Sequence, residues 1–359
     1  MSESLLSDQA QALTDQIARI PSLLAIHEFR LPADQPPWVD TEVDLLSGQW
    51  ITILGSGRVS WSSREQELWA GPKHHLWGKV GRAGKIFNPT QDTTTIPVLG
   101  SGRLFLGLLH GFWANERGVL ASDEKAYKGL SGEIVATVLV WDSEPGEDLV
   151  TLRDSTSLDA IAAEAKRYKA PVRTPQGWSY LFETGFGDIF RDVSTEYGPG
   201  IEVKVDNAQG IVRKPVRFPL TESTELCWRW RLDQFPSSVS ENTVRTHDYF
   251  SIACEFENGR DLTWFWSCDI PSETHFGCPV RDWNFREVHY CVRSGDQQLG
   301  TWIEERRNVF DDCRAALAED PGGVNHIWLI AVSSFQHGKG LCTFADVWLR
   351  DGERSIKVL

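Results

Sequence analysis

Short apolar runs separated by turn residues occupy most of the chain and limit what it can fold into. Between Val43 and Val150 these runs are about five to nine residues long, rich in β-branched side chains and bounded by glycine. The same pattern returns at Glu225 and continues to Asp351. Runs of this length suit strands and are too short for most helices. We therefore expect an all-β protein built of antiparallel, jelly-roll-like sandwiches.

Two segments have helical spacing instead. Residues 3–18 place four apolar side chains on one helical face: Leu6, Ala10, Leu13 and Ile17. Residues 157–170 begin with Ser, Asp and Leu and end before Pro171, as a capped helix does. A length of 359 residues favours two domains. We expect this order: a helical arm (1–30), a first sandwich (31–155), a linker helix (156–175) and a Trp-rich second sandwich (176–359) with one short helix at 308–318.

The charge of the chain restricts its partners. Lys and Arg number 36 and Asp and Glu 50, a formal net charge of −14. Binding to nucleic acid or to anionic lipid depends on clustered cations, so neither partner is expected. No run approaches the roughly 18 apolar residues of a membrane span. The polar N-terminus has no basic, apolar leader, and we expect a cytoplasmic location.

The seven cysteines lie between Cys227 and Cys342, their number is odd, and no CxxC occurs. We expect them to be reduced, with neither a disulfide framework nor a zinc ribbon.

The motifs HExxH, GxSxG and the Walker loop are also absent from the sequence. Zinc-protease, α/β-hydrolase and nucleotide-driven activities therefore have no support, and we expect no cofactor and no bound metal.

Tryptophan is unusually frequent, with 16 residues. Four of them form two pairs of period two, so both rings of a pair share one face of a strand: Trp228 with Trp230, and Trp264 with Trp266. Leu226, Leu232 and Leu262 share these faces, which favours a place in the core. The alternative is a floor on which sugar rings stack, since the apolar face of a pyranose packs on an indole. Both interpretations stay open.

Two long polar loops, 233–248 and 267–285, are candidate functional segments, because loops of this length are uncommon unless functional. They carry or adjoin most polar candidates of this half: His247, Asp248, His275 and Cys278. Glu287 and His289 follow on one face of an expected strand and suit general acid–base chemistry. The same groups are ordinary metal ligands, but their spacing specifies no metal. Cys278 is a possible nucleophile without an evident partner.

These observations rank three functions. The first is recognition of a carbohydrate or similar polyhydroxylated molecule in a groove of the second sandwich, lined by Trp228, Trp230, Trp264, Trp266, His275, Arg307 and Asp248. The second is an acid–base enzyme that cleaves, eliminates or cyclises a sugar-like substrate in the same groove, with Glu287, His289 and His247 as catalytic residues. The third is a structural or assembly protein. The sequence leaves open whether the chain forms a homo-oligomer and whether it is an enzyme at all.

Residues 43–148 resemble the bacterial galactose-binding lectins of the Pseudomonas galactophilic type. The matching stretches are LLSGQWITILGSGRVSW, GSGRLFLGLLHG and GEIVATVLVWDSEPG. The resemblance implies a β-sandwich in which a calcium ion, held by the closing turn, binds the sugar. Asp142 matches a ligand position, whereas the turn DSEPGED has acidic residues in place of the paired asparagines of that family.

Residues from about 225 to 350 resemble an uncharacterised, Trp-rich bacterial family. Its pattern is WxWxxD, an acidic pair before a strand, a Trp-Ser strand end, WxxExRxxxD before a helix, and a last strand that enters an Asp. The positions that fit are Trp228, Trp230, Asp233, Trp266, Trp302, Glu305, Arg307, Asp311 and Asp346, with His247 in place of the first acidic residue of the pair. The resemblance implies a jelly-roll-like sandwich and no known activity.

Overall fold

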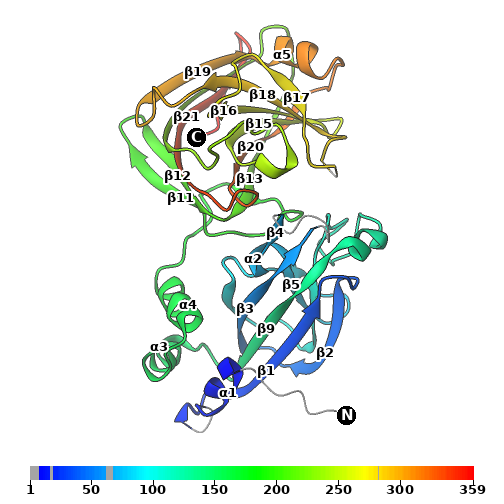
Figure 1. Ribbon diagram of the computed structural model, residues 1–359. Helices are drawn as coiled ribbons and strands as arrows, with labels where there is room; N and C mark the ends of the chain where they lie inside the picture. Colours follow the sequence, from blue (N-terminus) through cyan, green and yellow to red (C-terminus); the bar gives the residue numbers. More distant parts are fainter. Residues whose placement is uncertain (1–7, 17–18, 62–67, 282) are drawn as a thin grey trace. The chain divides into compact units, whose positions relative to one another are not determined.

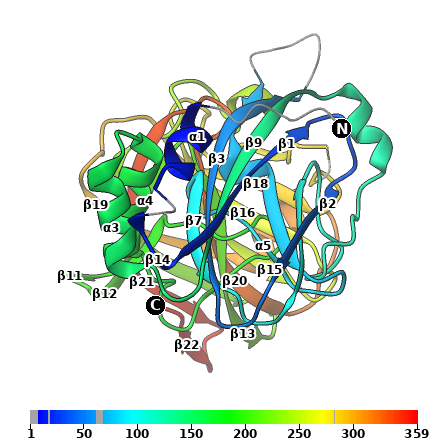
Figure 2. The same ribbon diagram turned by 90° about the horizontal axis from the view of Figure 1, so that it is seen from below.

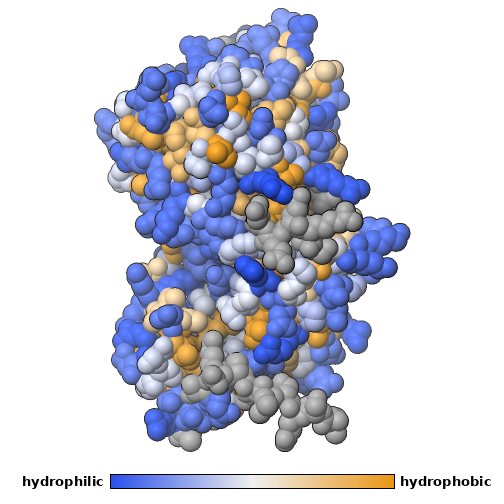
Figure 3. Space-filling model, in the orientation of Figure 1, coloured by the Kyte–Doolittle hydropathy of each residue, from blue (hydrophilic) through white to orange (hydrophobic). Residues whose placement is uncertain are grey.

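The computed structural model describes residues 8–16, 19–61, 68–281 and 283–359. They form two compact units, residues 1–171 and 172–359, each built mainly of strands (Figure 1). The expected all-β sandwich class is confirmed. Within the described residues, no helix is both long and apolar enough to cross a membrane. The face of each unit seen in Figure 3 is largely hydrophilic, in keeping with the acidic composition.

The first unit is a sandwich of two antiparallel sheets. Their inner faces meet in one apolar core, to which Ile53, Leu104 and Val138 belong. The five-stranded sheet has the order β1-β9-β3-β4, with β7 also beside β3: β1 Leu23–Pro32, β9 Ser131–Trp141, β3 Trp50–Ser60, β4 Trp69–Ala70 and β7 Thr93–Pro97. The four-stranded sheet has the order β2-β8-β5-β6: β2 Trp38–Leu45, β8 Gly102–Leu108, β5 Leu76–Val80 and β6 Ile86–Phe87.

Helices cover part of the outer face of the five-stranded sheet. A second apolar cluster joins Trp141 and Leu139 of β9 to Leu149, Ile161 and Ala165. The last three residues lie on two helices that pack side by side (Figure 2). The helical elements of this unit are α1 Asp8–Thr14, α2 Pro72–His75, the 3₁₀ helix η2 Glu124–Gly129, α3 Gly146–Ser155 and α4 Asp159–Lys169.

The ends of the first unit differ from the sequence expectation. Leu6 and Ile17 of the expected arm helix lie outside the described residues, and α1, which is described from Asp8, ends at Thr14. Most of the rest of the arm is β1, which pairs with β9 along its whole length. The expected linker helix is α4, and burial of its apolar face against β9 makes it part of the first unit.

The second unit is also a sandwich of two sheets. The six-stranded sheet has the order β11-β12-β21-β14-β19, with β22 also beside β21: β11 Phe190–Thr195, β12 Gly198–Asp206, β21 Lys339–Arg350, β14 Glu225–Gln234, β19 Trp302–Asn308 and β22 Ser355–Lys357. The seven-stranded sheet has the order β10-β13-β20-β15-β16-β18-β17: β10 Ser179–Tyr180, β13 Gln209–Phe218, β20 Val324–Val332, β15 Phe250–Phe256, β16 Asp261–Ser267, β18 Glu287–Ser294 and β17 His275–Gly277. The expected short helix is present as α5 Val309–Ala316, and Val244–Thr246 form the 3₁₀ helix η3.

The outer face of the seven-stranded sheet carries a layer of its own. Strand alternation turns Ala253, Phe265 and Cys291 away from the central core, into a separate apolar cluster that includes Ile270 and, at its edge, Phe276. The last two residues come from the segment between β16 and β18. This segment and the one between β14 and β15 are the two long loops noted in the sequence. They lie over the face of β18 that carries the candidate site.

Candidate metal centre

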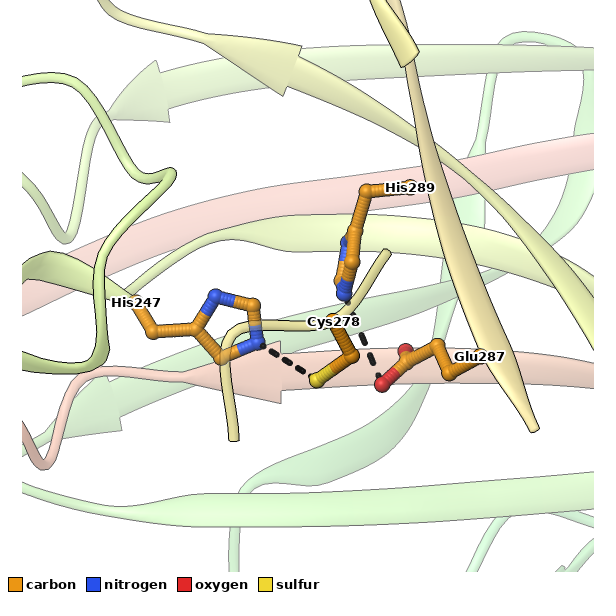
Figure 4. Close-up of side chains that lie close together, drawn as sticks. All are labelled: His247, Cys278, Glu287 and His289. Carbon is orange, nitrogen blue, oxygen red and sulfur yellow. Dashed lines mark hydrogen bonds and ion pairs between the residues drawn. The ribbon is translucent and has the colours of Figure 1, made fainter. Parts of the chain in front are cut away.

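Four side chains with metal-ligating atoms converge on the outer face of the seven-stranded sheet: His247, Cys278, Glu287 and His289. His247 follows η3 in the first long loop, and Cys278 follows β17 in the second. Glu287 and His289 lie two residues apart on β18 and share one face of the strand. Figure 4 shows the four side chains pointing toward one another. One ligating atom from each lies within 4.8 Å of the others.

The cluster is almost completely removed from solvent. The exposed fractions are 3% for His247, 1% for Cys278, 5% for Glu287 and 1% for His289. Aromatic rings surround the two imidazoles. Phe276 stacks on His289 at a centroid distance of 5.5 Å, and Tyr249 lies 4.8 Å from the His247 ring. The polar atoms of the cluster are therefore shielded from bulk solvent and depend on partners within the protein.

His247 is fixed in the tautomer that a metal ligand needs. Its Nδ1 lies 3.1 Å from the carbonyl oxygen of Glu241 and can donate to it. Its Nε2 points to the Cys278 thiol, 3.5 Å from Sγ. Burial lowers the pKa of His247 to about 3, so the ring is neutral at physiological pH. With the proton on Nδ1, the lone pair of Nε2 faces the centre of the cluster.

Glu287 is positioned by two hydroxyl groups. Tyr249 and Thr263 donate to its Oε1 at 3.4 and 3.2 Å. Its Oε2 lies 3.5 Å from Nε2 of His289. Burial acts to raise the pKa of Glu287, but the neighbouring His289 and His247 outweigh it and lower this pKa to about 2. Glu287 is thus a carboxylate with one oxygen held from outside and the other directed inward.

The other two members of the cluster, His289 and Cys278, are buried in surroundings that satisfy their polar atoms poorly. Nε2 of His289 is buried and has no hydrogen-bond partner among the described residues. Burial and the nearby Glu287 carboxylate raise the pKa of the Cys278 thiol far above its usual range. A catalytic cysteine needs the opposite shift, toward the thiolate. The surroundings therefore argue against Cys278 as a nucleophile.

A metal ion would satisfy all four groups. Zinc is held tetrahedrally at about 2.0–2.3 Å by imidazole nitrogen, thiolate sulfur and carboxylate oxygen, which places ligand atoms roughly 3.5 Å apart. Ligating atoms within 4.8 Å of one another need only small side-chain rotations to reach that geometry. The inward nitrogen atoms of His247 and His289, the thiol and the inward oxygen of Glu287 supply four ligands. The residues present fit a closed, four-coordinate site.

The structure brings together three of the residues singled out as catalytic, His247, Glu287 and His289. The sequence predicts no metal, and it indicates Cys278 only as a possible nucleophile and not as a ligand. The available signal was weak, a cysteine in a Gly-Cys-Pro turn nine residues before Glu287. No local spacing joins it to His247, because the contact is made across two loops.

Two other candidates lie apart from the cluster. His275 is exposed and stacks on Tyr290, whose ring points to the face of β18 opposite to that of Glu287 and His289. Arg307 lies over the same Tyr290 ring and pairs with Glu273 and Asp312, at 2.7 Å from each. The expectation that these two residues share one groove with the cluster is wrong. His275 alternates with Phe276, which faces the cluster, and Arg307 lies on β19 of the six-stranded sheet.

The predicted indole-lined groove is also wrong. Trp228, Trp230, Trp264 and Trp266 are at most 2% exposed and belong to the core between the two sheets. The face shared with Leu226, Leu232 and Leu262 is thus the core face. Asp248, expected to contact the ligand, is completely buried and accepts from the backbone N–H groups of Phe335 and Gln336, at 3.0 and 2.7 Å. It fixes the turn after β20.

The closing turn of the first unit, where the lectin resemblance implies a calcium ion, leads directly into a helix. Asp142 accepts a hydrogen bond from Ser143 at 2.7 Å, and the chain enters α3 four residues after Asp142. Glu147 and Asp148 lie in the first turn of that helix, where their charge opposes the helix dipole favourably. Asp148 also accepts a hydrogen bond from Ser22. Within the described residues, Asp142 belongs to no cluster of three or more ligating side chains.

Fold and site together define an all-β protein of two units whose second unit carries a buried cluster of His, Cys and Glu. Residues 188–348 match the model of a family described as a protein of unknown function (DUF3047). The matched stretch covers most of the second unit, including all four residues of the cluster. No curated protein matches the chain.

Several solved structures are distantly similar. The EclA N-terminal domain, a PllA-like lectin, is 21% identical, with coverage of 33% of this chain and 98% of that domain and a TM-score of 0.26. The xyloglucanase domain of NopAA from Sinorhizobium fredii, in complex with cellobiose, is 8% identical, with coverage of 50% and 94% and a TM-score of 0.32. Salicylate 1,2-dioxygenase from Pseudoaminobacter salicylatoxidans is 7% identical, with coverage of 99% and 98% and a TM-score of 0.16. Similarity this low transfers no function to the chain.

Proposed function

We propose that this protein is a metalloprotein whose second unit binds one divalent transition-metal ion through His247, Cys278, Glu287 and His289. The observation that carries the proposal is the convergence of four buried ligating side chains within 4.8 Å. Buried polar groups are normally hydrogen-bonded or bound to an ion, and the buried Nε2 of His289 makes no hydrogen bond, only the 3.5 Å ion-pair contact with Glu287.

Charge and ligand type favour zinc. When Cys278 is bound as a thiolate and Glu287 as a carboxylate, their two negative charges are neutralised by one divalent cation while both imidazoles remain neutral. Nitrogen and sulfur ligands suit zinc and other transition metals, whereas magnesium and calcium prefer oxygen alone. The hydrogen bonds from Tyr249, Thr263 and the His247 ring supply the outer contacts that orient metal ligands.

The closed geometry favours metal binding over the two functions ranked first from the sequence. A general acid must contact its substrate, and Glu287 and His289 are at most 5% exposed. Recognition of a carbohydrate remains a prediction, but the indoles predicted to floor its groove are core residues. A glycan would have to bind at another surface.

The proposal is tested by metal titration of the full chain after treatment with a chelator. Zn²⁺ should bind with a stoichiometry of one. Co²⁺ should give the near-ultraviolet charge-transfer band of a thiolate ligand and the intense visible bands of a tetrahedral ion. Cys278→Ser should abolish the charge-transfer band, and His289→Gln should weaken zinc binding by about 100-fold or more, because removal of even an outer contact costs about 10–100-fold.

Two variants serve as matched controls. Cys313→Ser replaces another buried cysteine, on α5, and His326→Gln replaces another histidine of the same sheet. Both should bind metal as the wild type does. Absence of stoichiometric binding, or binding that neither Cys278→Ser nor His289→Gln weakens, would refute the proposed function.

A further inference from the structure

The segment that carries Cys278 covers the other ligands. Residues 271–281, here called the covering segment, include β17, which pairs with β18 through three residues, and Glu273 and Thr274, which exchange backbone hydrogen bonds with Cys291 of β18. Phe276 of this segment stacks on His289 and packs against Phe265 of β16. The covering segment thus closes the outer face of β18 over the cluster.

The two long loops are joined firmly at one end. Glu241 of the first loop accepts from the Ser267 hydroxyl and, at 2.9 Å, from the backbone N–H of Cys268. Ser240 donates to Asp269 at 2.8 Å. These contacts hold the start of the second loop, at the end of β16, and leave the covering segment to be held elsewhere.

The covering segment meets the first loop at the cluster. Cys278 lies 3.5 Å from His247, at a sulfur–nitrogen distance typical of a weak hydrogen bond. The backbone N–H of Cys278 donates to the carbonyl oxygen of Glu287 at 3.0 Å. Against these contacts stands the burial of a carboxylate, a thiol and an imidazole nitrogen that makes no hydrogen bond and only a 3.5 Å ion-pair contact with Glu287. In the absence of an ion, that burial opposes closure.

We infer that the metal ion holds the covering segment closed over the cluster. The inference rests on the proposed metal site and adds its role. One ion bonded to His247, Cys278, Glu287 and His289 joins the first loop, the covering segment and β18 at a single point. With the ion bound, the buried polar groups are satisfied and the segment stays closed. Without it, opening admits water to Glu287 and His289.

Hydrogen exchange of the full chain, followed by mass spectrometry, tests this inference. Removal of zinc by a chelator should accelerate amide exchange in residues 271–281 by about tenfold or more, because exchange there then proceeds through local opening. Exchange in β12 and β21 of the other sheet should not change.

A variant in the first loop makes the test specific. His247→Gln alters no residue of the covering segment, yet at limiting zinc it should raise exchange in residues 271–281, because the ion is lost. After chelation, the difference between the variant and the wild type in that segment should shrink to the small effect of the lost Cys278–His247 contact. Cys313→Ser should behave as the wild type in both states.

The possible outcomes distinguish failure of the inferred role of the ion from failure of the proposed metal site. If Co²⁺ spectra show metal bound to the cluster but chelation leaves exchange in residues 271–281 unchanged, the inferred role of the ion in closing this segment is refuted and the metal site stands. If no metal binds, both are refuted. Metal binding together with zinc-dependent protection of residues 271–281 supports both.

Discussion

Asp261 and Glu287 are direct neighbours across the parallel strands β16 and β18, and both carboxyl groups are buried. The same register continues through Glu255 on β15 to His326 on β20. A row of four titratable side chains therefore crosses four strands and ends at the candidate metal centre. Arg286 donates to Asp261 at 3.1 Å and lies 3.7 Å from Glu255. Burial and the Glu287 charge raise the pKa of Asp261 well above its usual range.

Replacement of Arg286 tests how this row is stabilised. Arg286→Met should lower the free energy of unfolding by about 3–5 kcal/mol, because removal of one partner leaves buried carboxyl groups without a cation. Adding Asp261→Asn should recover part of that loss, since the amide carries no charge. Urea denaturation of the single and double variants measures both effects. If the stability loss of the double variant equals the sum of the losses of the two single variants, Arg286 and Asp261 do not interact.

Trp264 tests the assignment of the paired indoles to the core. Its ring is fully buried, and its Nε1 donates to Asp312 at 2.8 Å. Trp264→Ala should cost about 3–5 kcal/mol of stability through the cavity that it leaves. Trp264→Phe should cost less, because much of the ring volume is kept. A Trp264→Ala protein with wild-type stability in urea would place this indole outside the core and restore the predicted platform.

Two fragments of the first unit differ in a helix that the structure places on its sheet. Residues 1–171 contain α4, whereas residues 1–155 lack it and leave Leu139 and Trp141 of β9 partly uncovered. The longer fragment should show a cooperative thermal transition at a higher temperature than the shorter one, because Ile161 and Ala165 no longer pack in the shorter fragment. Circular dichroism melts measure this. Identical transitions would mean that α4 contributes nothing to the first unit.

The stability of the first unit should depend on pH through His75. This buried ring accepts from the indole N–H of Trp61 at 2.9 Å, and its Nδ1 lies 2.7 Å from the Leu109 carbonyl oxygen. Burial lowers the pKa of His75 from 6.5 to about 4. Below pH 6.5, His75 takes up a proton in the unfolded chain, whereas in the folded chain it stays neutral until the pH approaches 4. Stability present above pH 6.5 is therefore lost as pH falls toward 4, by up to about 3 kcal/mol.

Hydrogen exchange of β9 in the full chain, measured between pH 4 and 7 and corrected for intrinsic rates, reports this loss. In His75→Gln the same region should lose less stability over that range. A wild-type protein whose β9 protection is independent of pH between 4 and 6.5 would contradict the assignment of a neutral, buried His75.

Parts of the fold could be read from local pattern, and other parts could not. The strands β14, β15, β16, β18, β20 and β21 and the helix α5 were predicted, because each carries its own apolar run or cap. The strands β11 and β12 lie before Glu225, where the pattern of apolar runs returns. Gly198, Pro199 and Gly200 interrupt the pattern of β12, and only pairing with β21 makes it a strand. The helix α3 was missed because its first residues resembled a lectin turn.

The amino-acid sequence by itself determined the all-β class, the placement of Glu287 beside His289 and the shared face of each indole pair. Those features follow from the period of two along a single strand. Only the tertiary structure decided which face is the core and which faces an outer layer, since alternation alone does not distinguish them. It also decided that Cys278 meets His247. Their contact joins two loops 31 residues apart, and no local spacing encodes a distance set by how both loops pack on the sheet.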